Sequence, residues 1–340
     1  MVKARLPRPE AVAQILIWHQ GALGDLLLAG PALAALRRHY PGARITALGH
    51  PGRWALFTPT LRLTAVWDSG AAAWAPLFAG ASPLPPLLNA RLAPFQLAVI
   101  FSPRPHPALA ARLAQAGVGS VVQLPSWPRE DDPEPVGALQ ARHLTRLGAS
   151  CPGEPFRLKM GGDWAIPLPA RLNLPGPFLA VAPGSGHARK NWPLAHYYEV
   201  TRELAWNHGL TVVWLAGPGE RPLLPYLRGL AAAQDQLLLA DLPLTRVAAA
   251  LARCRLYLGG DSGLTHLAAA AGAAQVLALF GPTDPRTWSP RGPRVKILTA
   301  PCPKAPCAPA REITCPAPVC LENLPASQVL EAASALLQDG

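Results

Sequence analysis

Residues 255–280 read RLYLGGDSGLTHLAAAAGAAQVLALF, and this stretch decides the fold. The apolar run 255–259 predicts a strand, residues 262–272 predict a helix, and residues 275–280 predict a second strand. A helix between two short apolar strands is typical of a βαβ unit, in which the two strands are parallel. The stretch therefore predicts an α/β fold built on a parallel sheet.

The same alternation of strands and helices continues outward through both halves of the chain. In the second half it predicts strands at 178–182 and 210–216 and helices at 193–208, 221–233, 243–253 and 326–338. In the first half it predicts strands at 15–19, 44–49, 97–102 and 120–124 and helices at 25–40 and 107–117. Residues 67–95 give no clear pattern, and the Gly- and Pro-containing segment 161–177 is the expected linker. The chain has 340 residues, half of them hydrophobic, so two domains can each bury a core.

The charge of the chain is basic and unevenly distributed. The net charge is +11, and residues 1–170 carry 16 Lys and Arg against 9 Asp and Glu. A basic first half suits an anionic partner or an acidic membrane surface, with an ordinary solvated surface as the alternative. We expect no nucleic-acid partner, because the chain has no recognised binding motif. It also has no signal-peptide core and no run of about 18 apolar residues, so we expect a cytoplasmic protein, with a peripheral inner-membrane contact left open.

The segment WHQGALGDLLLAGPAL, residues 18–33, follows the first predicted strand. Gly21 and Gly24 let the backbone turn tightly and approach a ligand. Asp25 then stands at the start of a helix, where it is either a functional carboxylate or a simple helix cap. No third glycine follows at the spacing of the dinucleotide fingerprint, which disfavours a nicotinamide-dependent oxidoreductase.

Loops that follow strands in the second half have the composition of ligand sites. In APGSGHARKNWP, residues 182–193, Gly184 and Ser185 open a loop whose amides can cradle a phosphate, and Lys190 adds a positive charge. A further loop ends at Glu220, which can accept hydrogen bonds from ribose hydroxyls or can favour the start of a helix.

The loop in GGDSGLTHLAAAAG, residues 259–272, is the strongest candidate of these. Small residues around Asp261, Ser262 and Gly263 leave amides at a helix N-terminus unpaired, and these amides and the helix dipole suit a diphosphate. His266 can reach the same ligand from the first turns, or it can be a hydrogen-bonded structural histidine. We therefore expect the second half to hold a nucleotide diphosphate and the first half to present a base.

Taken in order, these segments and ALFGPTDPRTWSP at 278–290 resemble glycosyltransferase family 9, the heptosyltransferases of lipopolysaccharide core assembly. The resemblance covers nearly the whole chain. It implies the GT-B fold, with two Rossmann-like domains facing each other across a cleft. The domain at 1–165 would bind the acceptor and the domain at 175–340 the nucleotide sugar, with the final helix a candidate to pack back on the first domain.

The activity implied by the resemblance is an inverting transfer of heptose from ADP-heptose to a lipopolysaccharide-core or related cell-envelope acceptor. This acceptor would be an anionic glycolipid or glycan, and no metal ion or cofactor would be needed. Asp25 would be the catalytic base, which deprotonates the acceptor hydroxyl as it attacks the anomeric carbon. The donor-binding residues would be Gly184, Ser185, Lys190, Glu220, Asp261, Ser262, Gly263 and His266.

The acceptor site is less defined by the sequence. Gly24, Arg53 and Arg62 are the acceptor-binding candidates, and Arg104 and Arg112 are further basic ones. Each arginine is otherwise an ordinary surface residue. Heptose itself is implied by the family and is not visible in these residues.

Four cysteines, Cys302, Cys307, Cys315 and Cys320, lie close together in the sequence, and four thiolates can hold Zn²⁺. No pair has the common two-residue gap, and a reducing cytoplasm disfavours stable disulfides. We therefore favour reduced thiols or a labile disulfide over a structural zinc site.

Two alternative functions stay open. The same fold can transfer a sugar from another nucleotide diphosphate, or the chain can be a catalytically silent nucleotide-binding module. Retention of Asp25, Lys190, Asp261 and His266 together argues against the silent module, because a decayed site is expected to lose at least one of them.

Overall fold

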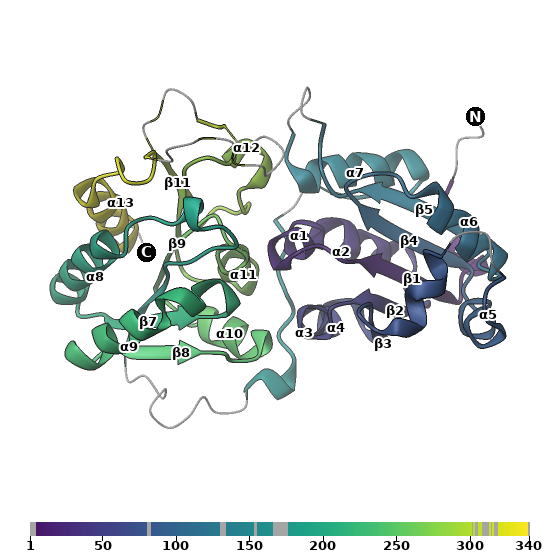
Figure 1. Cartoon of the computed structure of the whole chain (residues 1–340), viewed down its shortest axis with the longest axis horizontal. Helices are drawn as coiled ribbons and strands as arrows, with labels where there is room; N and C mark the ends of the chain where they lie inside the picture. The colour runs from purple at the N-terminus through teal and green to yellow at the C-terminus, as the bar shows by residue number, and fades with distance from the viewer. Residues whose placement is uncertain are drawn as a thin grey trace. The chain divides into compact units, whose positions relative to one another are not determined.

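The computed structural model describes residues 5–79, 83–129, 134–152, 155–165, 176–300, 302, 305–307, 313, 315 and 319–338. The chain divides into two compact units, Met1–Lys159 and Met160–Gly340. Each unit contains its own parallel sheet (Figure 1). The expected linker 161–177 begins at this boundary, and its residues 166–175 lie outside the described part of the chain.

The first unit has a five-stranded sheet in the order β3-β2-β1-β4-β5. Its strands are β1 Gln14–His19, β2 Arg44–Gly49, β3 Leu63–Asp68, β4 Leu97–Ser102 and β5 Ser120–Pro125. All neighbouring pairs are parallel. The strand order reverses between β1 and β4, and in open α/β sheets ligands bind beyond the carboxyl ends of the strands at such a point.

The helices of the first unit connect these strands. They are η1 Pro9–Ala11, α1 Leu23–Leu28, α2 Gly30–His39, α3 Pro51–Trp54, η2 Ala55–Phe57, α4 Thr58–Leu61, η3 Ala72–Leu77, α5 Pro86–Leu92, α6 Pro107–Gln115 and α7 Val136–Leu147. The helix predicted at 107–117 is thus present and slightly shorter.

The helix predicted at 25–40 is two helices, α1 and α2, in the structure. Pro31 lies in the first turn of α2. Proline has no N–H to donate to a preceding carbonyl, and its ring clashes there, so it is tolerated at the start of a helix and breaks the interior. The break leaves Asp25 in the first turn of a short, separate helix.

The second unit has a six-stranded parallel sheet in the order β11-β10-β9-β6-β7-β8. Its strands are β6 Phe178–Ala182, β7 Thr211–Ala216, β8 Leu237–Ala240, β9 Leu256–Gly260, β10 Val276–Phe280 and β11 Val295–Thr299. Its helices are η4 Gly162–Ala165, η6 Ala188–Lys190, α8 Leu194–His208, η7 Pro218–Leu223, α9 Leu224–Ala233, α10 Leu244–Leu251, α11 Gly263–Ala271, α12 Pro285–Trp288 and α13 Ala326–Gln338. The order reverses between β6 and β9, as in a doubly wound Rossmann-type sheet.

The three strands that the sequence does not predict, β3, β8 and β11, all lie at sheet edges. Their side chains are mostly half-buried or exposed, whereas the central strands β6, β9 and β10 are buried at every position. Continuous apolar runs mark the central strands, whereas β3 and β11 contain polar residues and β8 is apolar but only four residues long.

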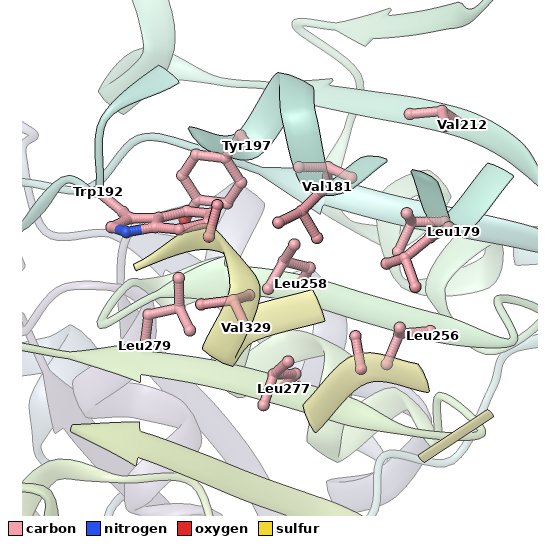
Figure 2. Close-up of a cluster of buried hydrophobic side chains, with 14 of the residues drawn as sticks. Leu179, Val181, Trp192, Tyr197, Val212, Leu256, Leu258, Leu277, Leu279 and Val329 are labelled. Carbon is pink, nitrogen blue, oxygen red and sulfur yellow. The ribbon is translucent and has the colours of Figure 1, made fainter. Parts of the chain in front are cut away.

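The core of the second unit lies between its sheet and the helices α8, α9 and α13. Figure 2 shows side chains of the central strands, among them Leu179, Leu256 and Leu277, clustered with Val329 of α13. α13 packs beside α8 on this face of the sheet (Figure 1). Its buried face is thus filled within its own unit.

None of the helices within the described residues is long and apolar enough to cross a bilayer.

Candidate functional site

The reversal point of the first sheet carries a pocket of about 230 Å³. Loops that follow β1, β4 and β5 form it together. Its lining residues are Trp18, Gln20, Gly21, Asp25, Phe78, Ile100, Phe101, Ser102, Pro103, His106, Leu109, Ser126 and Trp127. The pocket thus lies where the topology predicts a ligand, and Asp25 is the one carboxylate among these residues.

Asp25 both caps α1 and lines this pocket. Its side chain is only 5% exposed, and its Oδ2 accepts a hydrogen bond of 2.9 Å from the amide of Ala22. The two interpretations considered from the sequence, cap and functional carboxylate, are therefore compatible. The bond to Ala22 fixes the carboxylate in one orientation at the mouth of the turn.

The turn before α1 is packed too closely for a side chain at Gly21. A Cβ atom there would come within 2.7 Å of both Asp25 Cβ and His19 Cε1. The Nδ1 atom of His19 accepts a hydrogen bond of 3.2 Å from the Gly21 amide. Burial lowers the pKa of His19 to about 4, although Asp25 opposes this shift, so the imidazole is neutral at pH 7.

His19 is a residue of this site that the sequence did not single out. It ends β1 and is 3% exposed. Its position directly before the glycine turn was the available signal, but the burial of its ring could not be known without the fold.

The acceptor candidates do not lie together. The guanidinium of Arg53 donates to the carbonyl oxygen of Gly21 at 2.9 Å, so it supports the turn. Gly24 is half-buried within α1. Arg62 ends α4 with a φ of 51° and precedes β3, so it lies at the amino edge of the sheet, opposite the edge that bears Asp25. Arg112 is buried and donates to the carbonyl oxygen of Pro76, which is a structural role.

In the second unit, a charged network crosses the reversal point of the sheet. Lys190, from the loop after β6, donates to Asp261 Oδ2 at 2.8 Å, and Asp261 directly follows β9. Thr283, after β10, donates to the same oxygen at 2.8 Å. Three loops that are distant in the sequence are thus joined at one carboxylate.

The electrostatics of this network favour an ionised Asp261. Burial alone would raise its pKa, but the charge and hydrogen bond of Lys190, with smaller effects of His266 and Thr283, lower the pKa overall. His266 is 6% exposed in the second turn of α11. Thr283 ends the Gly-Pro-Thr segment 281–283, which the family resemblance implies lies beside the donor site.

Lys190 is held in place by its neighbours in the sequence. Trp192 is buried in the core and donates from Nε1 to the carbonyl oxygen of Leu324 at 2.9 Å. Arg189 donates to the carbonyl oxygens of Ile313 and Cys315. The conformation of this loop therefore depends on both the core and the segment after β11.

The loop after β6 also contacts the loop after β7. A Cβ at Gly184 would come within 2.7 Å of Glu220 Cγ. Glu220 is 3% exposed and accepts from the Gly217 amide at 2.9 Å. Burial raises its pKa, against the effect of hydrogen bonds from the Gly217 and Gly184 amides. Ser185 Oγ donates to the carbonyl oxygen of His187 or to Asn191 Oδ1, so its hydroxyl stabilises the loop.

The N-terminus of α11 lies next to Asp261. Ser262 is the N-cap residue, and its side chain does not bond a backbone amide of the helix. Its hydroxyl lies 3.3 Å from that of Thr265. The first amides of this nine-residue helix, from Gly263 onward, therefore have no side-chain cap, which is the arrangement that suits an anion.

The four C-terminal cysteines do not form a recognisable metal centre. All six cysteines of the chain are free thiols, and the described residues include no group of three or more His, Cys, Asp or Glu arranged to hold a metal ion. Burial, followed by smaller effects of neighbouring cysteines, raises the pKa of the Cys307 and Cys320 thiols.

Comparison with known proteins shows what these features resemble. The family model of glycosyltransferase family 9 (heptosyltransferase) matches residues 161–318. Lipopolysaccharide heptosyltransferase 2 of Salmonella typhimurium is 28% identical over 127 residues, which are 36% of this chain and 36% of that protein. The chain thus aligns with about a third of the length of this curated relative.

Solved structures match over almost the full chain. A glycosyl transferase family 9 protein from Veillonella parvula has a TM-score of 0.79 at 17% identity, covering 99% of this chain and 100% of that one. The E. coli heptosyltransferase WaaC, solved with ADP, has a TM-score of 0.71 at 18% identity, covering 95% and 99%. The expected fold class, an α/β chain with two Rossmann-like units of the GT-B type, is therefore confirmed.

Proposed function

We propose that this chain, whose residues 161–318 belong to glycosyltransferase family 9, is an inverting glycosyltransferase that uses a nucleotide-diphosphate sugar. The donor is ADP-heptose in this proposal, because the E. coli heptosyltransferase WaaC, which has the same fold, has been solved with ADP and with ADP-2-deoxy-2-fluoro heptose. The acceptor is an anionic glycan or glycolipid of the cell envelope, reached in the cytoplasm or at the inner face of the membrane.

The observation that carries the proposal is the convergence of Lys190, Asp261 and Thr283 beside the uncapped N-terminus of α11. A diphosphate gains negative charge as it leaves. Backbone amides and an ammonium group that are already fixed in place can stabilise this charge. Asp261 orients the Lys190 ammonium, and Glu220 is placed to accept from ribose hydroxyls. This charge supply lets us propose that the transfer step needs no metal ion.

Asp25 is the general base in this proposal. An acceptor hydroxyl attacks the anomeric carbon from the face opposite the diphosphate, and the new C–O bond forms as the bond to the diphosphate oxygen breaks. The hydroxyl proton passes to Asp25, and the electron pair of the broken bond leaves on ADP. A single carboxylate is enough for inversion. The burial of Asp25 and its fixed orientation suit this role.

The test is the Asp25→Asn variant. Asparagine can still accept from the Ala22 amide, so α1 keeps its cap, but it cannot take a proton. We expect turnover of ADP-heptose with a cell-envelope glycan extract to fall about 10²- to 10⁴-fold, while ADP binding by calorimetry stays unchanged. The matched control is Asp68→Asn, which alters a carboxylate that also accepts from a backbone amide but lies outside the pocket. Near-normal turnover of Asp25→Asn would exclude this residue as the base.

The competing donor is another nucleotide-diphosphate sugar. A ligand that binds only the folded state raises the melting temperature, so ADP-, UDP- and GDP-linked sugars can be ranked by thermal shift. The largest shift with an ADP-linked sugar supports the proposal. A larger shift with UDP- or GDP-linked sugars replaces the donor, and binding with no transfer to any acceptor would favour the silent nucleotide-binding module.

A further inference from the structure

Four cysteines that follow β11 in the second unit play no part in the proposed transfer reaction. All four are free thiols, and they are Cys302, Cys307, Cys315 and Cys320. Seven residues separate Cys307 from Cys315 in the sequence, yet their side chains form a hydrogen bond with each other. The fold thus brings together two sulfur atoms that can be oxidised to a disulfide.

The other two cysteines lie near this pair. Burial is the main cause that raises the pKa of the Cys307 thiol, and the neighbouring Cys315 and Cys302 thiols raise it further. Burial also raises the pKa of Cys320, with smaller effects of Cys302 and Cys307. Cys320 is 4% exposed, whereas Cys307 and Cys315 are half-buried. A small soluble reagent therefore has better access to the hydrogen-bonded pair than to Cys320.

Cys315 is joined to the loop that carries Lys190. Arg189 donates hydrogen bonds to the carbonyl oxygen of Cys315 at 2.7 Å and to that of Ile313 at 3.0 Å. A charged donor makes a stronger hydrogen bond than a neutral one. Because Arg189 directly precedes Lys190, the position of the Cys315 backbone helps to fix the position of the Lys190 ammonium group.

Cys307 is joined to the Gly-Pro-Thr segment. Its amide donates to the carbonyl oxygen of Pro282 at 2.9 Å. Thr283 follows Pro282 and donates to Asp261 Oδ2, the oxygen that also accepts from Lys190. The backbones of the two cysteines therefore support the two loops that meet at Asp261.

We propose that Cys307 and Cys315 are a reversible thiol oxidation site, whose disulfide displaces the loops of Lys190 and Thr283 and weakens nucleotide binding. The effect on a nucleotide rests on the proposed function, but the disulfide itself does not. A disulfide is shorter than a hydrogen bond between two thiols, so its formation draws the two backbones together. The hydrogen bonds from Arg189 and to Pro282 are made by these backbones and must shift with them.

The oxidant in this proposal is a small disulfide such as oxidised glutathione. The thiolate of one cysteine attacks a glutathione sulfur, and the first glutathione leaves as a thiolate. The second cysteine thiolate then attacks the protein sulfur of this mixed disulfide, so the bond between the two cysteines forms and the second glutathione leaves. Two electrons and two protons pass from the cysteine pair to the oxidant, and the products are one protein disulfide and two reduced glutathione molecules.

The first measurement locates the disulfide. The full chain is analysed for bound metal, treated with oxidised glutathione, alkylated and digested with trypsin. Trypsin separates the cysteines into three peptides: 297–304 with Cys302, 305–311 with Cys307, and 312–340 with Cys315 and Cys320. We expect mass spectrometry to find 305–311 joined to 312–340, and reduction to release the two peptides. Stoichiometric metal held by these cysteines, or no link between the two peptides, would overturn the proposal.

Serine variants identify the pair. Cys307→Ser and Cys315→Ser should each abolish the joined peptides, because serine has no sulfur, whereas Cys320→Ser should retain them. The control is Cys151→Ser, which removes a half-buried thiol of the first unit and should leave the link unchanged. A link that persists in Cys315→Ser would contradict the proposed pair.

Calorimetry then measures the effect on ADP binding. We expect the oxidised chain to bind ADP about fivefold more weakly than the reduced chain, because the hydrogen bonds of Arg189 and Pro282 are weakened, and dithiothreitol to restore the affinity. Cys307→Ser and Cys315→Ser should bind ADP like the reduced chain, with or without oxidant. Equal affinity of the oxidised and reduced unaltered chains, or the same loss in Cys307→Ser after oxidation, speaks against the inference.

The two measurements separate this inference from the proposed function. If the disulfide forms but the reduced chain does not bind ADP, the transferase proposal fails together with the expected effect on ADP, while the oxidation site stands. If the reduced chain binds ADP and Asp25→Asn loses turnover, but Cys307 and Cys315 do not become linked, the oxidation site alone fails.

Discussion

Two buried carboxylates, Asp25 and Asp261, show how the surroundings of a side chain decide what it can do. Asp25 accepts a hydrogen bond from one backbone amide and lines a pocket. Asp261 is held between Lys190 and Thr283 and has a lowered pKa. The first arrangement suits a group that takes a proton from a ligand, and the second suits a permanent anion that orients an ammonium group.

The pairing of Lys190 and Asp261 should be visible in the pH dependence of stability. The pKa of Asp261 is lower in the folded state than in the unfolded state, where it is near 3.9. The stabilisation from this group is therefore complete above its unfolded pKa and is lost as the pH falls through the folded pKa. In Lys190→Met, burial is no longer opposed by the lysine, so the pKa of Asp261 should rise above its usual value and the group should destabilise the protein at pH 7.

Urea denaturation can measure this effect. At pH 7 we expect Lys190→Met to lower the free energy of unfolding by about 3 kcal/mol, because it leaves a buried carboxylate unpaired. The double variant Lys190→Met/Asp261→Asn should recover part of this loss. The difference in free energy of unfolding between Lys190→Met and Lys190→Met/Asp261→Asn should shrink as the pH is lowered from 7 to 5, because Asp261 then becomes protonated in the single variant. If this difference in free energy of unfolding did not depend on pH, it would contradict the conclusion that Lys190 keeps the Asp261 carboxylate ionised.

At the scale of elements, the turns after strands position the site more than the helices do. The turn between β1 and α1 brings His19, Gly21 and Asp25 into direct contact. The sequence correctly indicated a tight glycine turn here, because glycine is the residue that permits close approach. The prediction of one helix at 25–40 missed the break between α1 and α2, although Pro31 in the first turn of α2 is a local signal for it.

Replacement of Gly21 tests how closely this turn controls Asp25. In Gly21→Ala the new Cβ would clash with Asp25 Cβ and His19 Cε1, so the carboxylate must move. We expect turnover to fall at least about tenfold, since small displacements of a catalytic group are costly, and the melting temperature to fall by several degrees. The control is Gly42→Ala, where no atom lies within 4 Å of the added Cβ, so stability should change by no more than about 0.5 kcal/mol. Equal effects of the two variants would show that the packing around Gly21 is unimportant.

At the scale of the whole molecule, the chain consists of two units, each with its own sheet and its own reversal point. The charged network of Lys190, Asp261 and Thr283 belongs to the second unit, and the carboxylate of Asp25 belongs to the first. The proposed binding of a nucleotide and the proposed role of Asp25 as a base can therefore be tested separately.

Hydrogen exchange with and without ADP tests the division of roles. ADP should slow the exchange of amides at 183–191 and 261–266 about tenfold or more, because these loops lie at the reversal point of the second sheet. Amides of β1, α1 and β4 in the first unit should exchange as before and serve as the internal control. Protection confined to the first unit would reverse the proposed roles of the two units.

The sequence by itself determined the α/β class, the central strands and the loops that carry Asp25, Lys190 and Asp261. Central strands such as β6 and β9 are buried on both faces, so their apolar runs are visible without a structure, and glycine turns mark the ends from which loops start. Tertiary structure alone decided which loops meet. The contacts of Lys190 and Thr283 with Asp261 join residues that are distant in the chain, and His19 is neutral because its ring is buried. Such contacts depend on strand order and side-chain burial, and a local pattern of residues contains neither.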